Sequence, residues 1–112
     1  MKLETVHQGR VTILRPQGDI KIGEGDVALK EAIRRELEAG QRHFVLNLEG
    51  VRFMDSAGLG ELVANLKRVR EAGGDLKVCG ANQRISDAFH VTQLVKVLEI
   101  HPTEQEAIAS FV

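Results

Sequence analysis

Hydrophobic and polar residues follow two periods along this chain. Residues 2–7 and 11–15 alternate one by one, as strands with a single buried face do, and Gly9 between them predicts a hairpin or a bulge. Three short apolar runs, each bounded by turn residues, predict further strands at 43–48, 76–80 and 94–100. We therefore expect five strands.

Between these strands, apolar residues recur every three or four positions, which is typical of amphipathic helices. A first helix starts at Asp26 and is closed by Gly40, and a short one is capped by Asn82. In the last helix, Thr103 and Glu106 have the spacing of a capping box. The clearest apolar stripe comprises Leu59, Leu62, Val63, Leu66 and Val69, with Glu61, Asn65, Lys67, Arg68 and Glu71 expected to face solvent.

The order of these elements predicts an α/β fold. Strands that alternate with helices favour a largely parallel sheet, and the first two strands add an antiparallel edge. The 112 residues contain no internal repeat and no low-complexity linker, so we expect residues 1–112 to form one domain.

Composition narrows the classes of partner. The chain has 15 basic and 16 acidic side chains and a net charge of −1, and its only aromatic residues are four phenylalanines, so neither nucleic acid nor a membrane is an expected partner. No apolar run approaches the ~20 residues of a membrane span, and the amino terminus lacks the apolar core of a signal peptide. With a single cysteine, Cys79, these features predict a cytoplasmic protein.

The segment VRFMDSAGLGEL, residues 51–62, joins a predicted strand to the clearest helix. Glycine inside a helix costs about 1 kcal/mol relative to alanine, so Gly58 and Gly60 in its first turns suggest a role besides folding. Ser56 could act only as a cap that accepts a hydrogen bond from the amide of Gly58 or Leu59. The glycines, however, leave the backbone open to close approach by another molecule.

Catalytic and metal-binding interpretations find little support in the sequence. Gly18 and Gly23 have the spacing of a phosphate-binding loop, but Glu24 stands where that motif needs lysine. MDSAG resembles a nucleophile elbow in which Met54 replaces the first glycine. The histidines at 7, 43, 90 and 101 lack metal-ligand spacing. We therefore expect no cofactor, no metal and no enzyme activity.

A phosphate on Ser56 would meet favourable electrostatics within the chain itself. It adds roughly 1.5 to 2 negative charges at a helix amino terminus, where free amides and the helix dipole favour anions. A partner surface fitted to the neutral serine would not accept the new charge. Ser56 is therefore a candidate for a reversible switch.

The DSAGLG of residues 55–60 resembles the phosphorylation motif of the STAS domain family, the anti-sigma factor antagonists of bacteria. The similarity extends to GDI at 18–20, HFVLNLEGVRFMDSAGLGELV, the double glycine, LKVCGANQRISDAF and LEIHPTEQEAIASF. It implies a STAS-like mixed β-sheet of four to five strands with about four helices packed mainly on one side.

The resemblance also implies a function and a set of site residues. An unmodified antagonist binds an anti-sigma factor that is also a serine kinase and displaces the sigma factor; the kinase phosphorylates the motif serine with ATP, and a serine phosphatase restores the binder. The acceptor would be Ser56. The expected partner-binding residues are Asp19, Lys21, Asp55, Ser56, Ala57, Gly58, Leu59 and Gly60, with Lys21 in a loop where many relatives carry an acid. The alternatives are a STAS scaffold in another signalling assembly and, behind it, a serine hydrolase.

Overall fold

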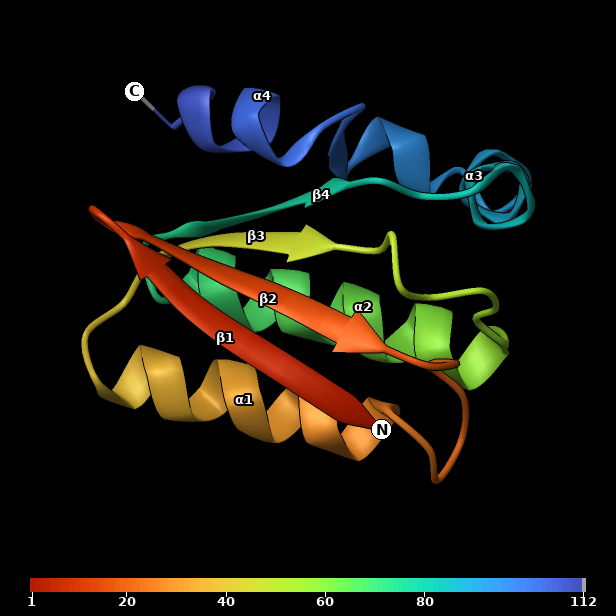
Figure 1. Ribbon diagram of the computed structural model, residues 1–112, viewed down its shortest axis with the longest axis horizontal. Helices are drawn as coiled ribbons and strands as arrows, with labels where there is room; N and C mark the ends of the chain where they lie inside the picture. Colours follow the sequence, from red (N-terminus) through yellow and green to blue (C-terminus); the bar gives the residue numbers. More distant parts are fainter. Residues whose placement is uncertain (112) are drawn as a thin grey trace.

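The computed structural model describes residues 1–111 and is built on a five-stranded sheet in the order β1-β2-β3-β4-β5 (Figure 1). β1 runs antiparallel to β2, and every later neighbour is parallel, which confirms the predicted mixed sheet with an antiparallel edge. The strands are β1 Lys2–Gln8, β2 Val11–Gln17, β3 His43–Asn47, β4 Asp75–Cys79 and β5 Glu99–His101.

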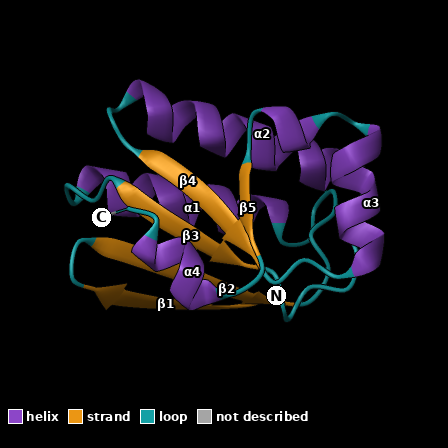
Figure 2. Cartoon of the chain, turned by 90° about the horizontal axis from the view of Figure 1, so that it is seen from above, coloured by secondary structure: helices purple, strands orange, loops and turns teal. Residues whose placement is uncertain are grey.

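Helices cover the two faces of the sheet unequally. α1 (Asp26–Glu38) and α2 (Ser56–Glu71) lie against one face, whereas α4 (Glu104–Ala109) lies against the other (Figure 2). α3 (Gln83–Val91) stands at one end of the sheet, and its Ile85 and Phe89 join the core under α1 and α2. This is the predicted fold, with most of the helical cover on one side. Among residues 1–111, no helix is both long enough and apolar enough to cross a membrane.

The two faces of β3 show how the sheet buries its apolar residues. Phe44 and Leu46 point into the larger core, while Val45 between them packs in the smaller cluster beneath α4, with Ala107. Because both faces are covered, the strand is apolar without interruption instead of alternating. Side-chain caps form where they were predicted: Asn82 accepts from the amide of Ile85 at 2.8 Å, and Thr103 accepts from that of Glu106 at 3.2 Å.

The prediction of one strand across residues 94–100 is wrong. The segment begins with a 3₁₀ turn, η1 (Leu94–Lys96), and β5 starts only at Glu99. Leu94 and Leu98 are buried, but Val95 and Val97 are 36% and 49% exposed, so the segment has no second apolar face to bury. A local hydrogen bond from the amide of Leu98 to the carbonyl of Leu94 closes the turn instead.

The predicted faces of α2 are also partly wrong. Asn65, expected in solvent, is fully buried, and Val63, assigned to the buried stripe, is 40% exposed. The buried residues of this helix include Gly58, Leu62, Asn65 and Val69. The side of the helix that carries Gly58 therefore faces the core. Asn65 Oδ1 accepts a hydrogen bond from Arg68 Nη1 at 2.6 Å, which supplies one polar partner inside the core.

Candidate functional site

The segment between β3 and α2 is held beside the segment that follows β2. The amide of Ile20 donates to the carbonyl of Phe53 at 3.0 Å, and the amide of Asp55 donates to the carbonyl of Ile20 at 3.3 Å. Ile20 also pairs with Met54 in a parallel bridge. The pairing of β2 with β3 is thereby continued past the ends of both strands, and it fixes the start of α2 relative to the loop at 19–25.

Asp55, not Ser56, caps α2. Its Oδ1 accepts from the amide of Gly58 at 2.8 Å, and its Oδ2 accepts from the amide of Ile22 at 3.2 Å. The hydrogen bond from Gly58 is the largest cause that lowers the pKa of the Asp55 carboxyl, and Ile22 and the charge of Lys21 act in the same direction. The capping role considered for Ser56 is therefore wrong, because the residue before it already satisfies the helix amide.

Ser56 is the first residue of α2 and is exposed. Within residues 1–111 its hydroxyl forms no hydrogen bond, and the backbone that carries it is held by the Asp55 cap. A serine placed in this way presents a free hydroxyl on a rigid helix start. The arrangement is suited to contact with another molecule or to modification by one.

The two glycines of the motif do different things. A Cβ atom on Gly58 would lie 2.1 Å from the carbonyl oxygen of Ile20, so Gly58 permits the close approach of α2 to the loop after β2. A Cβ atom on Gly60 would meet nothing within 4 Å, and Gly60 is exposed. Gly60 lies one turn after Ser56 on the same helix face and keeps the surface there flat. Only the first glycine is required by packing.

The remaining motif residues and Lys21 lie near the start of α2. Ala57 and Leu59 are half-buried, and Leu59 packs against the main core. The backbone of Lys21 exchanges two hydrogen bonds with that of Glu24, at 2.7 and 2.9 Å, which closes a tight turn. Its ammonium lies 3.4 Å from Glu24 Oε2. The structure thus places the loop of Lys21 directly against the Asp55 cap.

Asp19 faces a different neighbour. Its side chain is 17% exposed, and Oδ2 lies 3.8 Å from Arg52 Nη2.

Sequence reasoning missed Ile22, which is 76% exposed at the tip of the Lys21 turn and donates its amide hydrogen to Asp55. A large apolar residue inside an otherwise polar turn was the available signal. Ile22 adds an apolar side chain to the surface around Ser56. We call this surface, formed by Lys21, Ile22 and residues 55–60, the Ser56 surface.

The histidines and the cysteine are engaged away from Ser56. His7 contacts Glu36, His101 lies 2.6 Å from Glu99, His90 contacts the carbonyl of Ser86, and the ring of His43 stacks on Phe111. Burial raises the pKa of the Cys79 thiol to about 12. Residues 1–111 hold no group of three or more His, Cys, Asp or Glu side chains placed to bind a metal. No hydrogen bond among residues 1–111 joins a histidine to Ser56, as the activation of a hydrolase nucleophile would need.

Comparison with known proteins gives concordant results. The STAS domain family model matches residues 2–107. The Anti-sigma F factor antagonist of Paenibacillus polymyxa is 31% identical, over 96% of this chain and 92% of its own length, and the Anti-sigma-B factor antagonist of Staphylococcus aureus is 28% identical, over 90% and 93%. The crystal structure of the Thermotoga maritima protein TM1081 superposes with a TM-score of 0.90 at 27% identity, covering 96% of this chain and 92% of that one.

The fold agrees with that of the solved relative, and the sequence match includes the candidate site. The matched region contains all five strands and the whole of α2 with its Asp55 cap and exposed Ser56. The similarity also extends over nearly the full length of each relative, so it covers more than a shared motif. The chain therefore belongs to the STAS domain family and, within it, to the anti-sigma factor antagonists.

Proposed function

We propose that this protein is a binding switch gated by phosphorylation of Ser56. Unmodified, the Ser56 surface binds an anti-sigma factor that is also a serine kinase, and the sigma factor is released. The kinase then phosphorylates Ser56, binding is lost, and a serine phosphatase restores it. The observation that carries this proposal is the exposed Ser56 hydroxyl, free of internal hydrogen bonds on a helix start that Asp55 already caps. The exchange takes place in the cytoplasm, where kinase, ATP and sigma factor meet.

The chemistry of the switch belongs to the kinase. Ser56 Oγ attacks the γ-phosphorus of ATP, the bond from that phosphorus to the β–γ bridging oxygen breaks, ADP leaves, and the hydroxyl proton passes to a base of the kinase. This protein contributes the acceptor and its placement. The names of the relatives from Paenibacillus polymyxa and Staphylococcus aureus support an anti-sigma factor as the partner.

The fold tolerates the phosphate better than an interface does. At the first position of α2 the added charge lies near free helix amides and the positive end of the dipole. Lys21 stands on the adjoining turn, and its charge already acts on Asp55. In an interface closed over Ser56, the same phosphate would be desolvated against a partner surface fitted to the neutral serine, and Lys21 is already paired with Glu24. Burial of a charge under these conditions costs several kcal/mol.

The phosphorylation test uses the anti-sigma factor kinase of the same organism with ATP, followed by mass spectrometry. We expect one phosphate on the parent chain and none on Ser56→Ala. Ser86→Ala is the matched control, because Ser86 is half-buried in α3 and should leave the phosphate in place. Undiminished phosphate on Ser56→Ala would contradict the assignment.

Binding is tested separately by titration calorimetry. Ser56→Asp should melt like the parent, because aspartate favours a helix amino terminus, yet should bind the kinase more weakly. Ser56→Ala should keep both properties. Asp55→Asn should lower both kinase affinity and phosphorylation rate if the carboxylate helps to present Ser56. A partner bound equally well by the parent and Ser56→Asp would instead indicate a scaffold.

A further inference from the structure

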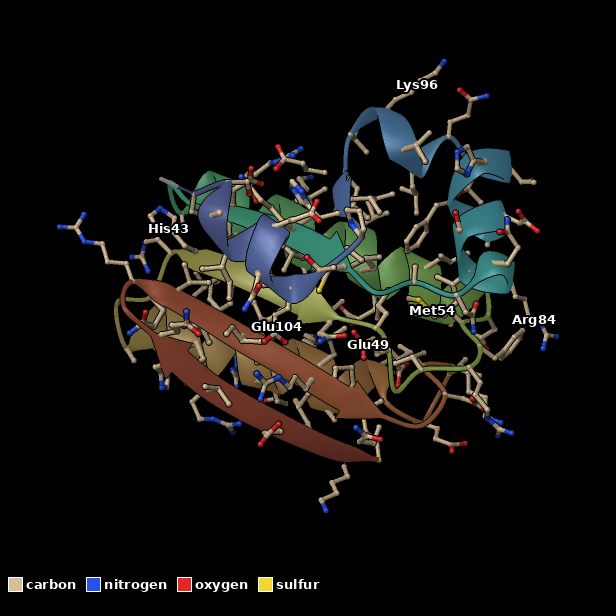
Figure 3. All side chains as sticks on the ribbon, turned by 45° about the horizontal axis from the view of Figure 1, so that its top comes forward. His43, Glu49, Met54, Arg84, Lys96 and Glu104 are labelled. Carbon is tan, nitrogen blue, oxygen red and sulfur yellow. The ribbon has the colours of Figure 1, made fainter. Side chains whose placement is uncertain are left out.

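A second surface feature adjoins the Ser56 surface. Asp19, Arg52, Phe53 and Arg84 line a hollow of about 330 Å³, which we call the arginine hollow. Phe53 lies two residues before Asp55, and its carbonyl accepts the hydrogen bond from Ile20 that fixes the start of α2. Figure 3 shows Arg84 projecting from α3 at the same end of the molecule as Met54. A partner seated on Ser56 would therefore reach this hollow.

The charges in the arginine hollow do not balance. The Arg84 guanidinium lies over the Phe53 ring, 4.7 Å from its centroid, and no carboxylate of residues 1–111 approaches it within 4.0 Å. The Arg52 side chain is 87% exposed, and its only carboxylate neighbour within the same residues is Asp19, at 3.8 Å. Two guanidinium groups thus face a single carboxylate.

The two arginines are held in different ways, Arg52 through its backbone and Arg84 through its side chain. The side-chain amide of Asn82 donates to the carbonyl of Arg52 at 3.1 Å, so the start of α3 is tied to the loop that carries Arg52 and Phe53. The stacking of Arg84 on Phe53 restricts the long side chain before any partner arrives. A charged group that is ordered in advance loses less conformational entropy on binding. The hollow thus offers one ordered guanidinium, that of Arg84, beside the exposed side chain of Arg52.

We infer that the arginine hollow receives an acidic side chain of the anti-sigma factor kinase when that kinase docks on the Ser56 surface. The planar guanidinium groups match a carboxylate through paired hydrogen bonds. A protein carboxylate fits the molecule better than a nucleic acid does, because the chain as a whole carries a net charge of −1. This inference rests on the proposed function and adds to it a second contact, remote from the phosphate acceptor.

The test compares charge-reversed variants in binding to the purified kinase that phosphorylates Ser56. Arg52→Glu and Arg84→Glu should each weaken binding about tenfold or more, and the parent should lose more affinity than either variant as salt is raised. Arg10→Glu is the matched control, since Arg10 is exposed in the turn between β1 and β2, at the other end of the sheet, and should bind like the parent. Thermal melts show whether each variant is folded. If a charge-reversed variant unfolds, the neutral variants Arg52→Gln and Arg84→Gln take its place in the binding test.

Each outcome separates this inference from the proposed function. Replacement of an acidic residue of the kinase by lysine should restore binding to one of the charge-reversed variants. If the parent binds in a Ser56-dependent manner and both reversals match Arg10→Glu, the arginine hollow is not a contact and the switch stands. If the reversals weaken binding only when the kinase holds ATP, the occupant is a nucleotide phosphate and the carboxylate is ruled out. If the parent binds no such kinase, both proposals fail.

Discussion

At the scale of single residues, the start of α2 is governed by close approach and by one carboxylate. Gly58 allows the helix to touch the carbonyl of Ile20, and Asp55 ties the helix start to the turn at Ile22. Ser56 stands between these two structural residues and has no partner of its own within residues 1–111. The motif therefore combines residues that build the start of the helix, Asp55 and Gly58, with an exposed residue, Ser56, that is open to contact by another molecule.

The two glycines should respond to alanine in opposite ways. Gly58→Ala places a methyl group 2.1 Å from a backbone oxygen, so we expect a loss of about 1–3 kcal/mol in the free energy of unfolding, or more. Gly60→Ala enters open space in a helix and should raise stability by about 0.5–1 kcal/mol. Urea unfolding of both variants measures the difference, and equal effects would contradict the assignment. If Gly60 lies in the proposed interface, the more stable variant should bind the kinase less well.

Asp55 should titrate below the ordinary carboxyl pKa of 3.8, chiefly because the amide of Gly58 donates to it. Because the folded-state pKa is the lower one, its contribution to stability is present above pH 3.8 and is lost as pH falls through the folded value. Lys21→Gln removes one favourable charge and should raise the pKa without abolishing the shift. Carbon NMR of the carboxyl groups follows both forms, and a parent Asp55 that titrates at or above 3.8 would refute the cap.

At the scale of elements, α4 depends on polar contacts more than the other helices do. It is six residues long and contributes a single buried residue, Ala107. Glu104 reaches from its first turn to the sheet, where it accepts from Arg15 of β2 at 2.7 and 2.9 Å and from Asn47 of β3 at 2.8 Å. Figure 3 shows Glu104 between α4 and the strands. This network fastens the helix to the face opposite α1 and α2.

Glu104→Gln should therefore loosen α4. The variant loses the charge that pairs with Arg15, and charge-assisted hydrogen bonds of this kind contribute about 1.5–3 kcal/mol. Glu106→Gln is the matched control, because Glu106 is exposed on the same helix. Urea unfolding gives the stability difference, and amide exchange should quicken in α4 only for Glu104→Gln. Identical behaviour of the two variants would show that the network does not hold the helix.

At the scale of the whole molecule, Ser56 and the α4 network occupy different parts of the fold. Ser56 begins α2, beyond the ends of β2 and β3, and Glu104 begins α4. α2 and α4 lie against opposite faces of the sheet (Figure 2). A change in stability at α4 should therefore leave the proposed phosphorylation of Ser56 unaltered. Carboxylates whose pKa is lowered are found in both regions, so acidification should lower the stability of both together.

The protein should lose stability steadily on acidification. Hydrogen bonds from His101 and then Lys77 lower the pKa of Glu99 to about 2, and Arg15 is the main cause that lowers that of Glu104. With folded pKa values below the ordinary 4.5, both contributions are present above pH 4.5. That of Glu99 disappears toward pH 2, and that of Glu104 is lost as pH falls through its folded pKa. Thermal melts from pH 7 to pH 2 should show this fall, and a Glu99→Gln/Glu104→Gln protein should show a flatter one. A parent whose melting temperature is constant over that range would contradict the assignment.

Much of this molecule follows from its sequence alone. Residue spacing predicted the order of strands and helices, the mixed sheet, and the caps at Asn82 and Thr103, because these depend on neighbours within a few positions. The DSAGLG motif likewise predicted the family, and the full-length similarity confirms it.

Tertiary contacts decided the rest. Asn65 is buried and Val63 is exposed because α2 packs against the sheet through its Gly58 side. Neighbouring residues of a helix point about 100° apart, and the pattern of apolar residues alone does not determine the rotation of the helix about its axis so finely. Asp55 caps α2 through the nearby amide of Gly58, but its second hydrogen bond, from the amide of Ile22, joins segments that are distant in sequence. The same close approach of separate segments assembles the arginine hollow from residues 19, 52, 53 and 84, a set that no local pattern connects.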